Sequence, residues 1–207
     1  MVKKRQTVAE FVAELARDPD YQARRRRIEA DTAQRLKTLQ AAQAPLVAAL
    51  AQVDIKIDSV WDLVNTKAQY PAAVPILVEH LTRPYPDAVL EGIIRALAIP
   101  ESKRYWKTLM RLFEEHPGPE SSQVKDALAL ALSAAADDTL IDDVIRLVQV
   151  PSHGGRRIVL LNALATSSAS RAHAALNAAA SDPQLSREAR FQLRRHRQHI
   201  RRTALFG

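Results

Sequence analysis

The stretch PILVEHLTRPYPDAVLEGIIRAL, residues 75–97, decides the fold, because it holds an apolar helix, a proline-rich turn and a second apolar helix. The same order recurs in residues 109–132, 143–164 and 172–196, with a turn rich in Pro, Gly, Ser or Asp each time. One such helix pair cannot bury its apolar face alone, whereas stacked pairs can. The pattern therefore predicts an all-α protein with about four stacked helix pairs.

The spacing of the pairs indicates how they stack. The landmark residues Leu97, Leu132 and Leu164 of the second helices lie 35 and 32 residues apart. A period in the low thirties with two helices per unit is typical of an α-solenoid. Strand signals are scarce: only residues 54–58 alternate, and this run is brief.

The units resemble HEAT-type repeats, in the broad HEAT/armadillo-like sense. The closest match to the family's pattern is PDAVLEGIIRALA, residues 86–98, where the small residues Gly92 and Ala96 stand where neighbouring helices approach. The third unit departs from the pattern with GGRRIVLLNAL, and the fourth ends in a polar, arginine-rich helix, as a capping repeat would. The resemblance implies a right-handed α-solenoid. The organisation we expect is an N-terminal helical extension in 1–58, HEAT-like repeats in 59–200 and a basic tail in 201–207.

Helix start and stop signals organise the N-terminal extension. Thr7 can cap a short helix, and Asp18 can cap a longer one that has Pro19 at its first position. Pro45 should kink or end this longer helix, and Ser59 caps the next one.

An apolar stripe runs along the longer helix. Tyr21, Ile28, Leu36 and Leu39 follow at spacings of 7, 8 and 3 residues, which places them in one narrow row. The stripe has two interpretations that the sequence leaves open. It packs on the first repeat, or it pairs with the same helix of a second copy.

Composition narrows the class of protein. The chain has no cysteine, which removes disulfides, thiolate metal sites and cysteine nucleophiles. No apolar run approaches the roughly 20 residues that cross a bilayer, so we expect a soluble, cytoplasmic protein. The net charge is +7, but residues 53–185 carry thirteen Lys and Arg against sixteen Asp and Glu. The basic charge therefore lies at the two ends of the chain.

The run Arg24–Arg27 looks at first like a nucleic-acid contact. Consecutive residues of a helix turn by about 100°, so four of them cannot form one basic face. Arg25 and Glu29 are spaced as an i,i+4 ion pair, as are Arg27 and Asp31. We interpret the run as the solvated side of a helix.

The C-terminal arginines are the stronger basic signal. Residues 186–207 carry seven arginines and one glutamate. Steps of three and four residues place five of them on one helix face, where they could follow a nucleic-acid backbone. These are Arg187, Arg190, Arg194, Arg197 and Arg201.

No set of residues forms a catalytic or metal site in the sequence pattern. His196 and His199 have metal-ligand spacing, but arginines surround them. The pairs Asp137-Asp138 and Asp142-Asp143 are typical of a helix start, and the SHGG loop of an inter-helix turn. Trp61 and Trp106 lie among apolar residues and are expected in the core. We therefore expect no enzyme activity, no cofactor and no metal.

The sequence leaves two hypotheses for the function of this protein. HEAT-type solenoids usually bind along a concave face lined by the second helices, so the first hypothesis is a protein-binding module with an unidentified, acidic partner. Small HEAT proteins of the bacterial type resemble scaffold, regulatory and immunity proteins. The second hypothesis is nucleic-acid binding through the C-terminal arginines. The exposed second-helix positions expected to bind are Glu91, Arg95, Asp126, Arg157, Arg190 and Arg194.

Overall fold

A computed structural model describes residues 7–116 and 122–195. Within these residues the chain is all-helical and contains no strand, which confirms the predicted all-α class. The chain forms two compact units, residues 1–42 and residues 43–207.

The N-terminal unit holds α1 (Val8–Leu15) and the first part of α2 (Pro19–Ala51). The two predicted caps are confirmed: Thr7 forms a capping box with Glu10, and the Asp18 Oδ1 accepts hydrogen bonds from the first backbone N–H groups of α2. Of the two predicted ion pairs, Arg25–Glu29 is present, with 2.7 Å between Arg25 Nε and Glu29 Oε1, whereas the described residues show no ion pair between Arg27 and Asp31.

The side chains of this unit are largely exposed. Arg24–Arg27 are all exposed, as their interpretation as a solvated helix side requires. Ile28 and Leu36 of the apolar stripe are also exposed, whereas Tyr21 and Leu39 are half-buried. Packing of this stripe on the first repeat or on a second copy stays a prediction.

Pro45 does not end α2, which continues to Ala51, so this alternative of the prediction was wrong. A proline inside a helix costs about 3 kcal/mol. Leu46 and Leu50 are fully buried in the last turns, and each contributes about 1.5–3 kcal/mol, which offsets that cost. The buried Gln43 also links α2 to Val60, because its Oε1 accepts a hydrogen bond of 3.0 Å from the Val60 N–H.

The C-terminal unit continues with α3 (Val60–Asn65), whose predicted cap Ser59 forms a capping box with Asp62. Consecutive helices then follow in pairs. Their bounds are α4 (Ala73–His80), α5 (Asp87–Ala96), η1 (Pro100–Tyr105), α6 (Trp106–Glu115), α7 (Gln123–Ala135), α8 (Ile141–Gln149), η2 (Pro151–Arg156), α9 (Arg157–Thr166) and α10 (Ser170–Ala179). Residues 186–195 are helical as well.

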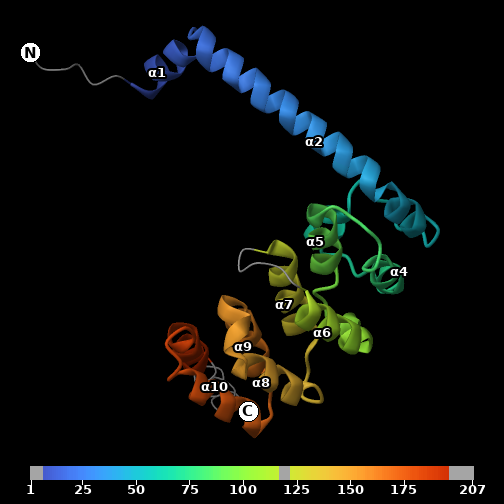
Figure 1. Cartoon of the computed structure of the whole chain (residues 1–207), viewed down its shortest axis with the longest axis vertical. Coiled ribbons are helices and arrows are strands. Elements are labelled where there is room, and N and C mark those ends of the chain that lie inside the picture. Colours follow the sequence, from blue (N-terminus) through green and yellow to red (C-terminus); the bar gives the residue numbers. More distant parts are fainter. Residues whose placement is uncertain (1–6, 117–121, 196–207) are drawn as a thin grey trace, which may run out of the picture. The chain divides into compact units, whose positions relative to one another are not determined.

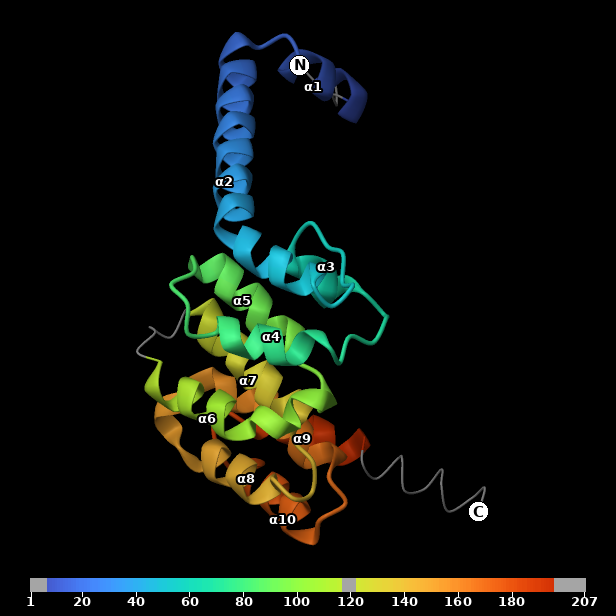
Figure 2. The ribbon, with the colours of Figure 1, turned by 90° about the vertical axis from the view of Figure 1, so that its right-hand side faces the viewer.

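The second helices of the pairs pack side by side. α7 contacts α5 on one side and α9 on the other, while α5 also contacts α3. Each of these helices also contacts its own first helix, in the pairs α4–α5, α6–α7 and α8–α9. Within this unit the first helices form one layer and the second helices another (Figures 1 and 2).

Specific contacts hold neighbouring pairs together. A Cβ added to Gly92 of α5 would lie 2.5 Å from Val60 Cγ1, so only glycine permits this approach of α3 and α5. The Trp106 indole Nε1 donates a 2.8 Å hydrogen bond to Asp143 Oδ2, which joins α6 to α8. Trp106 is buried, as predicted, and Trp61 packs half-buried against Gly92.

Candidate binding surface

The second helices α7 and α9 each keep one side free. α7 is covered by α5, α6 and α9, and its exposed residues Gln123, Asp126 and Leu130 share the remaining side at spacings of three and four. α9 is covered by α7, α8 and α10. Its exposed residues are again spaced by four: Ile158, Asn162 and Thr166.

Two side-chain contacts fix how these free sides align. The Arg156 Nε lies 2.9 Å from Asp126 Oδ1, and the Ser133 Oγ donates a 3.0 Å hydrogen bond to the Val159 carbonyl. Both helices therefore run in the same direction at this contact. Leu130 lies between the two anchors on α7, and Ile158 lies between them on the neighbouring segment. The two exposed apolar side chains thus lie on the free sides of two adjacent helices.

The helical residues 186–195 border the free side of α9, and Phe191 is an exposed apolar residue of this segment. Asn162 lies one turn beyond Ile158, and it lines a hollow of about 430 Å³ together with Gln192 and Arg195. The Arg195 guanidinium carbon lies 5.8 Å from the centre of the Phe191 ring. Leu130, Ile158 and Phe191 are 36, 37 and 45% exposed, and we call these three residues the apolar strip.

Four exposed arginines surround Phe191 on its helix, and we call them the arginine rim: Arg187, Arg190, Arg194 and Arg195. None of them makes an ion pair with a carboxylate in the described part of the chain. Their own helix offers one carboxylate, Glu188, and this accepts a hydrogen bond from Gln192. By contrast, several arginines elsewhere in this unit pair with carboxylates, among them Arg83 with Glu79 and Arg111 with Glu115. The rim therefore presents uncompensated positive charge beside exposed apolar side chains.

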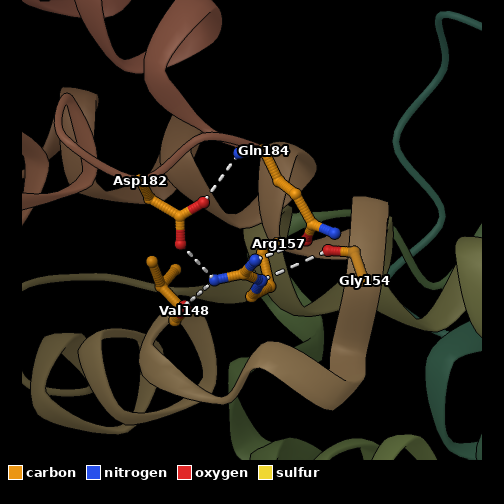
Figure 3. A network of polar contacts seen from close by, with 5 residues as sticks. All are labelled: Val148, Gly154, Arg157, Asp182 and Gln184. Atoms are coloured by element: carbon orange, nitrogen blue, oxygen red, sulfur yellow. Dashed lines mark hydrogen bonds and ion pairs between the residues drawn. The ribbon is translucent and has the colours of Figure 1, made fainter.

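Arg157 was predicted to be exposed on the binding face, and this was wrong: its side chain is 3% exposed. The guanidinium donates hydrogen bonds to the carbonyls of Gly154 and Val148, to Asp182 Oδ2 at 2.8 Å and to Gln184 Oε1 at 2.6 Å (Figure 3). The Arg157 guanidinium lowers the pKa of the Asp182 carboxyl by hydrogen bonding. Burial of Arg157 is tolerated because the guanidinium makes four hydrogen bonds inside the fold, one of them to a carboxylate.

Glu91 was also predicted to be exposed, and it is buried, with 7% of its surface accessible. Its Oε1 accepts a 2.7 Å hydrogen bond from the Nε of Arg95, one turn later on α5 and half-buried. The ion pair compensates the buried carboxylate. Glu91 therefore presents no free carboxylate to a partner.

The other predicted binding residues are exposed. Asp126 lies on the free side of α7, and Arg187, Arg190 and Arg194 lie in the arginine rim. Arg197 and Arg201, like His196, His199 and the tail 201–207, fall outside the described residues.

The acidic residues predicted at helix starts divide into two groups. Asp142 and Asp143 lie in the first turn of α8, as predicted. Asp137 and Asp138 precede α8, and Asp137 Oδ1 accepts a 2.9 Å hydrogen bond from the Thr139 N–H, in agreement with the prediction, but both residues also bind other segments. Asp137 pairs with Lys103, which together with Thr139 lowers the Asp137 pKa to about 2, while Asp138 accepts hydrogen bonds from Ser167 and Ser168. These contacts join the loops of successive pairs.

The SHGG loop lies between α8 and α9, in agreement with the prediction of an inter-helix turn. Gly154 has a φ of 58°, a left-handed conformation that favours glycine. His153 is buried and packs at 4.7 Å against the Phe113 ring, and this burial lowers the pKa of the imidazole. The loop therefore contributes packing to the core.

The sequence pattern did not lead us to predict that Leu130 and Ile158 are exposed. The buried residues of α9 include Arg157, Leu160, Leu161 and Leu164, which follow the i, i+3, i+4, i+7 pattern. Ile158 is an apolar residue outside this pattern. An apolar residue out of phase with the core stripe was the signal that could have located the apolar strip.

Comparisons with protein-family models, with curated proteins and with solved structures find no match to this chain. Its described helices include none with the length and hydropathy that a membrane span requires. Residues 7–116 and 122–195 hold no cluster of three or more His, Asp or Glu side chains placed to bind a metal ion.

Proposed function

We propose that this protein is a non-catalytic protein-binding module of the cytoplasm, and that it binds its partner through the free side of α7, α9 and residues 186–195. The observation that carries the proposal is the apolar strip. Exposed large apolar side chains in neighbouring positions mark interaction sites, and interface centres are enriched in aromatic and arginine side chains. Phe191 and Arg195 form such a combination at one end of the strip.

The proposal includes the architecture that the sequence predicts, a right-handed α-solenoid of HEAT-like pairs. The side-by-side contacts of α5, α7 and α9, and the separate layer of first helices, support it. In such a solenoid the second helices line the concave face. Its role would be that of a scaffold, regulatory or immunity-type protein.

Nucleic-acid binding is the second candidate, and one observation favours it. The arginine rim makes no ion pair with a described carboxylate, so phosphates could neutralise it. The exposed side chains of Leu130 and Ile158 weigh against this candidate, because a phosphate backbone offers no apolar surface that would cover them. The protein-binding proposal accounts for both features of the surface.

Site-specific photo-cross-linking in cells tests the proposal. A photoreactive amino acid replaces Ile158 on the binding surface or, as a matched control, Arg111 on α6 of the other layer. We expect position 158, and not position 111, to yield a discrete cross-linked protein. Cross-links to nucleic acid alone at position 158, or equal protein cross-linking at both positions, would refute the proposal.

A further inference from the structure

We infer that the partner presents an acidic amphipathic α-helix, whose apolar side chains cover the apolar strip and whose carboxylates pair with the arginine rim. This inference rests on the proposed function and specifies the partner's chemistry. It combines three properties of the surface: its apolar side chains, its uncompensated charge and its lack of free backbone groups.

The charge of the partner follows from the arginine rim. The interface would remove Arg187, Arg194 and Arg195 from water, and a buried cation is costly unless an anion pairs with it. Within the described residues, no carboxylate forms an ion pair with these arginines. The partner must therefore bring carboxylates, and guanidinium groups bind carboxylates with two parallel hydrogen bonds.

The helical form of the partner follows from the backbone of the surface. Leu130 and Ile158 lie on α-helices, and Phe191 lies in helical residues, so their backbone donors and acceptors are already used. An extended segment would bury backbone N–H and C=O groups with no partner on this surface. A helix satisfies its own backbone hydrogen bonds and can present an apolar stripe.

The spacing of the strip sets the pattern of apolar residues in the partner. Packed helices lie roughly 8–10 Å apart, so the apolar strip offers one anchor in about every 10 Å. Residues i and i+7 of an α-helix are separated by about 10.5 Å. We therefore expect apolar residues near i, i+7 and i+14, one for each residue of the apolar strip, with Asp or Glu beside them.

Selection from a displayed library of random peptides, each about 16 residues long and so about 24 Å as a helix, tests the inference. The full-length chain is the bait. Recovered peptides are then measured against Phe191→Ala, against Ile158→Ala and against the triple variant Arg187→Gln/Arg194→Gln/Arg195→Gln. Matched controls are Val53→Ala, which alters a similarly exposed apolar residue, and Arg83→Gln/Arg111→Gln, which alters one arginine just after α4 and one on α6. Circular dichroism confirms that each variant is folded.

The expected result is an enrichment of acidic peptides with this apolar spacing. Their affinity should fall about tenfold or more in each apolar-strip variant and in the triple arginine variant, and should stay unchanged in the controls. Peptides that depend on Phe191 and Ile158 but carry no acidic excess would overturn the inference and leave the proposed function intact. If no recovered peptide depends on the apolar strip, both fail, and salt-sensitive binding of a DNA duplex by the arginine rim would then identify the second candidate function.

Discussion

The Arg157 guanidinium lies 2.8 Å from the Asp182 carboxylate and so joins the first turn of α9 to the loop that precedes residues 186–195. Arg157 is buried, and its four hydrogen-bond acceptors come from three different segments of the chain (Figure 3). The contact thus holds in place the helix that carries Phe191 and the arginine rim. A residue that the sequence suggested for binding instead supports the binding surface.

Replacing Arg157 should destabilise the fold. The Arg157→Ala variant removes the guanidinium donor of Asp182 Oδ2, Gln184 Oε1 and the Val148 carbonyl, and we expect the free energy of unfolding to fall by about 3 kcal/mol. Arg111→Ala is the control, because it breaks an exposed i,i+4 pair worth at most about 0.5 kcal/mol. Urea denaturation measures both. A loss below about 1 kcal/mol in Arg157→Ala would contradict a structural role.

Two buried histidines should make stability depend on pH. His80 stacks on Tyr85, with 2.6 Å between its Nδ1 and the Tyr85 hydroxyl, and burial lowers the pKa of both His80 and His153 below 6.5. The unfolded chain then binds more protons than the folded chain just below pH 6.5. The histidine contribution to stability is therefore complete above pH 6.5 and is lost as the pH falls through the lowered pKa values.

The measurement is the free energy of unfolding between pH 7.5 and pH 5 (roughly the range in which histidine titrates). The double variant His80→Gln/His153→Gln should show a flatter profile over this range than the unmodified chain. Identical slopes would show that these imidazoles are not protected from protonation.

Asp137 should retain its charge far into the acid range. Its pKa of about 2, against an ordinary value of 3.8, arises mainly from its contact with Lys103 and from hydrogen bonds with Thr139. This ion pair contributes stability above pH 3.8, which is lost as the pH falls toward 2. Carboxyl NMR titration should show the Asp137 pKa rise toward 3.8 in Lys103→Gln. An unchanged pKa in that variant would exclude the loop-to-loop pair.

Gly92→Ala should destabilise the chain although alanine favours helices. The intrinsic gain is about 1 kcal/mol, but the new Cβ would meet Val60 Cγ1 at 2.5 Å and force α3 and α5 apart. We expect a net loss of about 1–3 kcal/mol by thermal or urea unfolding. In a Val60→Ala background, Gly92→Ala should lower the free energy of unfolding by less than it does in the unmodified chain. If the effects of the two substitutions on this free energy simply add, the contact between the new Cβ and Val60 is contradicted.

The apolar strip should be dispensable for folding. Phe191→Ala and Ile158→Ala alter exposed side chains, so each should change stability by no more than about 0.5 kcal/mol. Leu193→Ala removes a buried neighbour and should cost about 2–5 kcal/mol. A similar loss at Phe191 and Leu193 would mean that the strip belongs to the core.

Local sequence signals predicted the helices well. The caps at Thr7, Asp18 and Ser59 were correct because a capping side chain bonds to backbone within three residues. Pro45 was misjudged in part because the burial of Leu46 and Leu50 depends on residues far along the chain. The candidate site was less predictable for the same reason. The partners of Arg157 at positions 182 and 184 lie 25 and 27 residues away, and periodicity carries no sign of them.

Methyl NMR of Leu130 and Ile158 in the presence of the cross-linked partner tests the central claim most directly. These residues lie on the free side of α7 and α9, whereas Leu109 and Leu147 are buried methyl-bearing residues of α6 and α8. We predict that the partner shifts the Leu130 and Ile158 signals in a saturable manner and leaves those of Leu109 and Leu147 in place. Saturable shifts of Leu109 and Leu147, with the Leu130 and Ile158 signals unchanged, would contradict the account.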